Sequence, residues 1–139
     1  MAETLDLATR FYGAVAQGDM EAAASFIDAD RFVLLEADDL PFGGIFEGVE
    51  GFRALFARMK ELWKRAAVAD LSIVAHGDTA IARLHLDVIS RRTGATARLP
   101  LVEICDFEAG RIVKIQPFYF NAAAVWTVAG IDRNAPHSP

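Results

Sequence analysis

Three tight-turn signals divide the second half of the chain into four long segments, and they limit the possible folds more than any other feature. The turn signals are His76-Gly77-Asp78, Arg92-Thr93-Gly94 and Glu108-Ala109-Gly110. The segments that they separate are residues 67–75, 79–91, 96–107 and 111–120. Strands joined by tight turns pair antiparallel, and strands of about ten residues twist and curl. The sequence therefore predicts a curved antiparallel sheet of four long strands.

The first half of the chain has helical spacing. Apolar residues recur at steps of three and four in residues 5–15 and again in residues 48–65. Gly18 is suited to end the first helix, and Asp19 to cap a short second one. Residues 31–36 are expected to form a short strand, followed by a loop containing proline and glycine. Helices that all precede the sheet can cover only one of its faces, so we predict an α+β domain with the helices on the concave face.

Length and charge narrow the function classes. The 139 residues suffice for one domain, predicted as residues 1–131 with a frayed tail at 132–139. The net charge is −5, and nucleic-acid binding needs clustered positive charge. The basic residues do not gather: Lys60, Lys64 and Arg65 lie along the third predicted helix, and Arg91 and Arg92 lie at a turn. Nucleic acid is therefore not an expected partner.

Other classes are disfavoured by missing sequence features. The chain has no run of about 18 apolar residues, so no membrane-spanning helix is predicted. Its N-terminal segment lacks the apolar stretch of a signal peptide, and Cys105 is a lone cysteine that cannot form an intrachain disulfide. The histidines are not spaced with other residues as metal ligands. We expect a cytoplasmic protein without membrane contact, metal or cofactor.

Alternation along the long segments separates the two faces of the predicted sheet. Leu84 and Leu86 share one face, and a regular second turn brings Leu101 and Glu103 to the same side. The opposite face receives Arg83, His85 and Asp87. Burying a carboxylate is costly. Glu103 must therefore have a partner, meet a cavity, or be held neutral with a raised pKa.

The order helix–helix–strand–loop–helix–four strands resembles the nuclear transport factor 2-like superfamily, especially its SnoaL-like and ketosteroid isomerase-like branches. The motifs that carry the resemblance are Gly18-Asp19-Met20-Glu21-Ala22, Pro41-Phe42-Gly43-Gly44-Ile45-Phe46-Glu47-Gly48 and Phe107-Glu108-Ala109-Gly110-Arg111-Ile112. The resemblance implies a cone-shaped fold in which N-terminal helices pack in the concave face of a curved antiparallel sheet. The superfamily contains isomerases, cyclases, dehydratases, hydrolases and non-enzymatic binders.

The resemblance also implies roles for individual residues. Ketosteroid isomerase uses an Asp base together with a Tyr and a protonated Asp that bind the oxyanion. Glu103 corresponds to the oxyanion-binding acid. Asp39 corresponds to the base when counted from Gly48, with Asp38 and Glu36 as neighbouring alternatives. The position of the first-helix tyrosine holds Phe11, and Tyr12 is one step away, which is about 100° on a helix. Phe11, Tyr12 and Glu36 are also candidates for the ligand-binding wall, together with Leu101, Trp63, Tyr119 and Asn121.

Two functional hypotheses follow. The first is a cofactor-free enzyme that removes a proton next to a carbonyl of a small apolar substrate, as in isomerisation, cyclisation or dehydration. A loop carboxylate would act as base, and protonated Glu103 would hydrogen-bond the enolate. The alternative is a non-catalytic ligand-binding or dimerisation module of the same fold. In either case we expect a homodimer through the outer sheet face, where Val102, Ile104, Phe118 and Phe120 are apolar.

Overall fold

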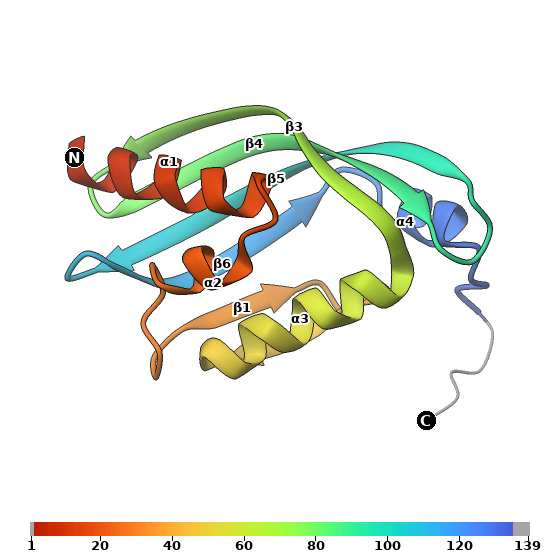
Figure 1. Cartoon of the computed structure of the whole chain (residues 1–139), viewed down its shortest axis with the longest axis horizontal. Coiled ribbons are helices and arrows are strands. Elements are labelled where there is room, and N and C mark those ends of the chain that lie inside the picture. The colour runs from red at the N-terminus through yellow and green to blue at the C-terminus, as the bar shows by residue number, and fades with distance from the viewer. Residues whose placement is uncertain (1, 135–139) are drawn as a thin grey trace.

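Six strands form one curved, unclosed sheet, and the helices α1, α2 and α3 lie on its concave side (Figure 1). A computed structural model describes residues 2–134. The helices are α1 (Ala2–Ala16), α2 (Met20–Ala24), α3 (Gly48–Leu62) and α4 (Ala122–Ala129). The strands are β1 (Val33–Glu36), β2 (Gly44–Glu47), β3 (Trp63–His76), β4 (Thr79–Ser90), β5 (Thr96–Glu108) and β6 (Arg111–Tyr119). The predicted α+β architecture is confirmed.

The sheet has the order β2-β1-β6-β5-β4-β3. Strands β3 to β6 form the predicted antiparallel series, in which each strand pairs with the next. Strand β1 joins the free edge of β6 in parallel, and β2 pairs antiparallel with β1. Helix α1 packs against β3 and β4, whereas α3 packs against β1, β2 and β3. The two helices therefore enclose a space above the middle of the sheet.

Two elements were not predicted from the sequence. Strand β2 follows a Pro- and Gly-containing loop and is only four residues long, so it carries little alternation. Helix α4 is apolar on every side and gives no amphipathic period. Its ends nevertheless follow ordinary capping rules: the Asn121 side chain accepts a hydrogen bond from Ala124 N, and Gly130 has a left-handed backbone with φ of +73°.

The third helix is shorter than predicted. It was expected to continue to about Arg65, but it ends at Leu62, and Trp63 begins β3 opposite Ser90. Strand β3 then has an irregularity between Ala69 and Ser72, where Asp70 has a φ of +53°. Such irregularities bend a strand. In Figure 1, β3 is strongly curved and runs from the end of α3 to a course alongside α1.

Alternation assigned the faces of the long strands correctly. Leu84, Leu86 and Leu101 are buried under the helices. On the opposite face, His85 Nδ1 lies 2.9 Å from a carboxylate oxygen of Asp70. Cys105 is fully buried in the core. The inner row of β5 therefore directs Glu103 toward the helices.

The ends of the chain bear on two further predictions. Residues 135–139 lie outside the described residues, so the frayed tail predicted at 132–139 stays a prediction. Within the described part of the tail, Arg133 Nη2 is 3.6 Å from Asp39 Oδ2. Across residues 2–134, no helix is long and apolar enough to cross a membrane.

Candidate functional site

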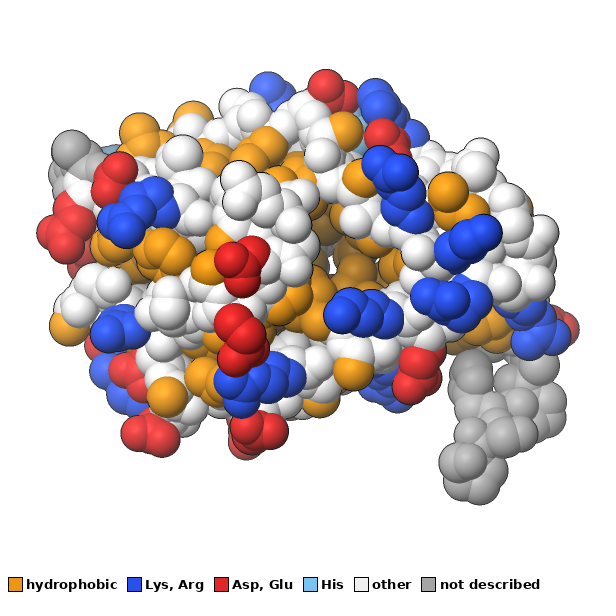
Figure 2. All heavy atoms as spheres, viewed as in Figure 1, with side chains coloured by type: hydrophobic (Ala, Val, Ile, Leu, Met, Phe, Trp, Pro, Cys, Tyr) orange, Lys and Arg blue, Asp and Glu red, His pale blue; other side chains and the backbone are white. Residues whose placement is uncertain are grey.

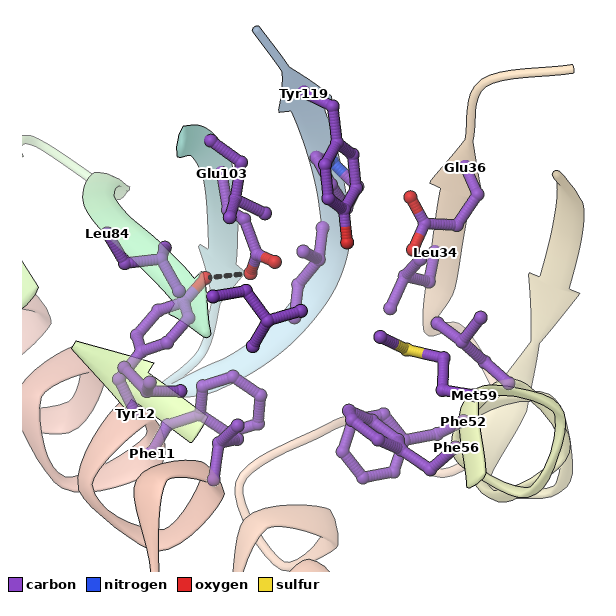
Figure 3. A pocket seen from close by; sticks show the side chains of 17 residues that line it. Phe11, Tyr12, Leu34, Glu36, Phe52, Phe56, Met59, Leu84, Glu103 and Tyr119 are labelled. Atoms are coloured by element: carbon purple, nitrogen blue, oxygen red, sulfur yellow. Dashed lines mark hydrogen bonds between the residues drawn. The ribbon is translucent and has the colours of Figure 1, made fainter. Parts of the chain in front are cut away.

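A mostly apolar cavity lies between the concave face of the sheet and the helices α1 and α3 (Figure 3). The cavity is small, with a volume of about 70 Å³ open to water-sized molecules. Four polar side chains are among its lining residues: Tyr12 from α1, Glu36 from β1, Glu103 from β5 and Tyr119 from β6. The remaining lining includes Phe11 and Leu101, both predicted as wall residues.

Glu103 is held by a tyrosine from the first helix. The Tyr12 hydroxyl donates a hydrogen bond of 2.7 Å to Glu103 Oε1 (Figure 3). Phe11 and Tyr12 are both buried and pack edge to face with ring centroids 5.0 Å apart. Both consecutive aromatics therefore face the sheet. Tyr12 therefore contacts the Glu103 carboxyl group, although it lies one residue after the position at which the family resemblance places a tyrosine.

Glu36 is the second carboxyl group of the cavity. It ends β1 on the same face as Leu34, and only 6% of its surface is exposed. Its Oε1 atom has no hydrogen-bond partner among the described residues. Burial, together with the nearby charge of Glu103, raises the pKa of Glu36 to about 9. Glu36 is therefore neutral at pH 7 and can donate a hydrogen bond.

Glu103 differs from Glu36 because it accepts a hydrogen bond from a tyrosine. Its surface is partly accessible because it borders the cavity, yet the lining around it is apolar, and this burial raises its pKa. The hydrogen bond from Tyr12 acts in the opposite direction, since it stabilises the carboxylate. Glu36 has no such donor among the residues that the structure describes. When the pair carries one negative charge, that charge therefore resides on Glu103.

The two tyrosines of the cavity stay protonated. Burial, and then the charges of neighbouring carboxyl groups, raises the pKa of both Tyr12 and Tyr119 well above the ordinary value. In Figure 3 the Tyr119 hydroxyl points into the space between Glu103 and Glu36. The cavity thus brings two carboxyl groups and two neutral hydroxyl donors together, an arrangement suited to moving a proton and stabilising an oxyanion.

The predicted loop base is not brought to this cavity. The Asp38 and Asp39 side chains are exposed and are not among the lining residues. Asp39 instead accepts a 2.6 Å hydrogen bond from Trp126 Nε1 through its backbone oxygen, and its carboxylate pairs with Arg133. Of the three carboxylates considered in this region, only Glu36 faces Glu103. The sequence signal for Glu36 was alternation in β1, which places Glu36 on the same inward face as Leu34.

Two other predicted wall residues also lie outside this cavity. Asn121 is exposed and caps α4. Trp63 is buried and lines a neighbouring hollow. Within residues 2–134, no group of three or more His, Cys, Asp or Glu side chains is placed to hold a metal ion.

Solved structures of low sequence identity share this fold. A nuclear transport factor 2-like protein of unknown function from Burkholderia pseudomallei superposes with a TM-score of 0.84 at 17% identity, covering 93% of this chain and 98% of that one. TerC, co-crystallised with polyporic acid, superposes with a TM-score of 0.83 at 18% identity over 92% and 98% of the two chains. A proposed polyketide cyclase from Xanthomonas campestris gives 0.79 at 21% identity over 92% and 97%. These likenesses define a nuclear transport factor 2-like fold.

The sequence itself identifies the family. The profile of the SnoaL-like domain matches residues 8–115, which is most of the chain and includes Tyr12, Glu36 and Glu103. No functionally curated protein has a matching sequence. The chain belongs to the SnoaL-like family.

Proposed function

We propose that this protein removes a proton next to a carbonyl group of a small, largely apolar substrate, without a cofactor. The observation that carries the proposal is the pair Glu103 and Glu36 in one apolar cavity, with a hydrogen-bond donor on Glu103 alone. Environments that drive the pKa values of two carboxyl groups apart assign one as base and the other as acid. Isomerisation, cyclisation and dehydration all use this step.

In the proposed reaction, ionised Glu103 takes the proton through the oxygen that Tyr12 does not contact. The C–H bond breaks, and its electron pair moves to the carbonyl oxygen, which becomes an enolate. Neutral Glu36 donates its O–H to that oxygen, and the Tyr119 hydroxyl is a second donor facing the same space. Return of the proton from Glu103 to another carbon regenerates the carboxylate. These roles differ from those implied by the family resemblance, where Glu103 is the neutral acid.

Deuterium exchange tests this chemistry directly. Methyl 4-acetylbenzoate in deuterated buffer should lose its acetyl proton NMR signal faster with the wild-type protein than in buffer alone. General-base catalysis contributes on the order of 10²–10⁴-fold, so Glu103→Gln should lower the protein-dependent rate by about 100-fold or more. Asp39→Asn is the matched comparison, because it makes the same carboxylate-to-amide change outside the cavity.

The outcomes separate the hypotheses. Loss of exchange in Asp39→Asn but not in Glu103→Gln would mean that the loop residue Asp39, and not Glu103, is the base. Binding of the ketone without exchange in the wild-type protein would reject catalysis of this step. It would favour the alternative that the cavity only binds a ligand.

We also propose that the protein forms a homodimer through the outer face of the sheet. Strand register places Val102 beside Phe118 and Ile104 beside Ile81, on the side opposite α1 and α3. Phe118 is 49% exposed and Ile81 is 40% exposed, and a group of exposed apolar side chains on one face is typical of a surface that another protein covers.

Phe118→Glu should convert the dimer to a monomer in light scattering coupled to size-exclusion chromatography, because it would place a charge inside the interface. Ile45→Glu is the control, since Ile45 is an exposed apolar residue on β2, at the opposite edge of the sheet from β3. A wild-type protein that is monomeric at high micromolar concentration, or equal effects of both substitutions, would contradict the dimer.

A further inference from the structure

A second hollow lies beside the cavity, between the end of α1, the end of α3 and the start of β3. Five side chains line both spaces: Val15, Phe56, Met59, Val68 and Leu86. The space-filling view shows an opening lined by hydrophobic side chains, with Lys and Arg side chains beside it (Figure 2). We call this second hollow the mouth, because it shares these side chains with the cavity around Glu103.

Four basic residues line the mouth: Lys60, Lys64, Arg65 and Arg91. Sequence reasoning found no cluster here, because the turn carrying Arg91 lies far along the chain from the other three. Folding brings this turn beside the junction of α3 and β3. None of the four forms an ion pair within residues 2–134. Arg65 lies opposite Ile89 on the outer face of the sheet, where its charge acts on Asp87. In a chain of net charge −5, the remaining cations at the rim of an apolar cavity attract anions.

Arg91 is fixed in its position at the mouth. Its Nε donates a 2.9 Å hydrogen bond to the backbone oxygen of Lys60, and its Nη2 donates a 3.4 Å bond to that of Trp63. These bonds satisfy carbonyl groups at the end of α3, and they also hold the guanidinium at the rim. Trp63 lines the mouth as well, and its buried indole N–H has no acceptor among the described residues. A buried donor without an acceptor is costly.

We propose that the ligand of this site is an amphipathic anion, whose apolar carbonyl-bearing end enters the cavity while its carboxylate remains at the mouth beside Lys60 and Lys64. The carbonyl end rests on the proposed function, whereas the anionic end rests on the mouth alone. The two ends of the site differ in charge, because the inner end holds Glu103 and the outer end holds the cations. A carboxylate is repelled from the first and attracted to the second, so the ligand binds in one orientation.

Two probes of the same shape test the anionic end. 4-Acetylbenzoate and its methyl ester share one apolar ketone and differ in the negative charge. Calorimetric titration at low salt should give a dissociation constant about tenfold lower for the acid. One exposed charge pair contributes less than a tenfold change in affinity, but more than one cation would act on the carboxylate together. Raising the salt to about 0.5 M should remove most of the difference, because the Debye length then falls well below 10 Å.

Two charge-reversal variants test whether the preference for the acid arises at the mouth. Lys64→Glu should abolish the preference for the acid. Arg58→Glu makes the same change in net charge on α3, outside the lining of the mouth, and should leave the preference within about twofold. Equal effects of the two variants, or no preference for the acid in the wild-type protein, including no binding of either probe, would overturn the inference.

Failure of this inference can be told apart from failure of the proposed function. If the acid and the ester bind equally but both exchange their acetyl protons, the anionic ligand is rejected and proton abstraction stands. If the acid binds preferentially through Lys64 and neither probe exchanges, the anionic ligand stands and proton abstraction is rejected.

Discussion

Glu36→Gln is expected to increase the free energy of unfolding at pH 8 and to lose this advantage as the pH falls toward 5. Burial, together with the nearby charge of Glu103, raises the pKa of Glu36 to about 9 in the folded protein, whereas an unfolded glutamate ionises near the model-peptide value of about 4.3. Between these two values the folded state binds one more proton than the unfolded state. Each pH unit in this window therefore lowers the stability of the wild-type protein by about 1.4 kcal/mol.

Urea unfolding of both proteins at pH 5, 6, 7 and 8 measures this difference. The stability of Glu36→Gln minus that of the wild-type protein should rise by up to about 4 kcal/mol from pH 5 to pH 8. Glu61→Gln, at an exposed position on α3, is the control and should change the difference by less than about 0.5 kcal/mol. A flat difference for Glu36→Gln would mean that Glu36 is ionised in the folded protein.

Gly51→Ala is expected to destabilise the protein by about 2–3 kcal/mol, although alanine favours helices. Gly51 lies in the first turn of α3, and a Cβ there would be 2.6 Å from the backbone carbon of Phe46 in β2. Backbone atoms cannot move aside as a flexible side chain can. The substitution should therefore push α3, which carries Phe52, Phe56 and Met59 of the cavity wall, away from the sheet.

Gly13→Ala in α1 is the matched control. A Cβ at Gly13 has nothing within 4 Å, so the change should stabilise the protein by about 0.5–1 kcal/mol through helix propensity. Chemical unfolding of the two variants gives the comparison. If both substitutions are stabilising, α3 does not approach β2 as closely as described.

The long strands and their faces could be predicted because alternation and tight turns are local signals. The rows through Leu84, Leu86 and Leu101 lie where alternation places them. Helix α4 was missed because an evenly apolar segment gives no period, and α3 was extended too far because Lys64 and Arg65 continue its composition. The end of that helix depends on the pairing of Trp63 with Ser90, which is a tertiary contact.

Half of the candidate site was visible in the sequence. Glu103 stood out as one carboxylate in an apolar row, and Tyr12 was a candidate for the ligand-binding wall. The second carboxyl group of the site was expected at Asp39, with Asp38 and Glu36 as alternatives, because the family resemblance gave more weight to loop position than to alternation in the four-residue strand β1. The cationic mouth was invisible, since it depends on Arg91 meeting the α3–β3 junction.

The most direct test of the central claim is a carboxyl-carbon NMR titration of Glu36 and Glu103 in the wild-type protein and in Glu103→Gln. We expect Glu36 to titrate near pH 9 in the wild-type protein and at lower pH in Glu103→Gln, because the neighbouring charge is then removed. Glu103 should titrate below Glu36. A Glu36 that is ionised at pH 7 in the wild-type protein would contradict the assignment of one neutral acid and one carboxylate to this cavity.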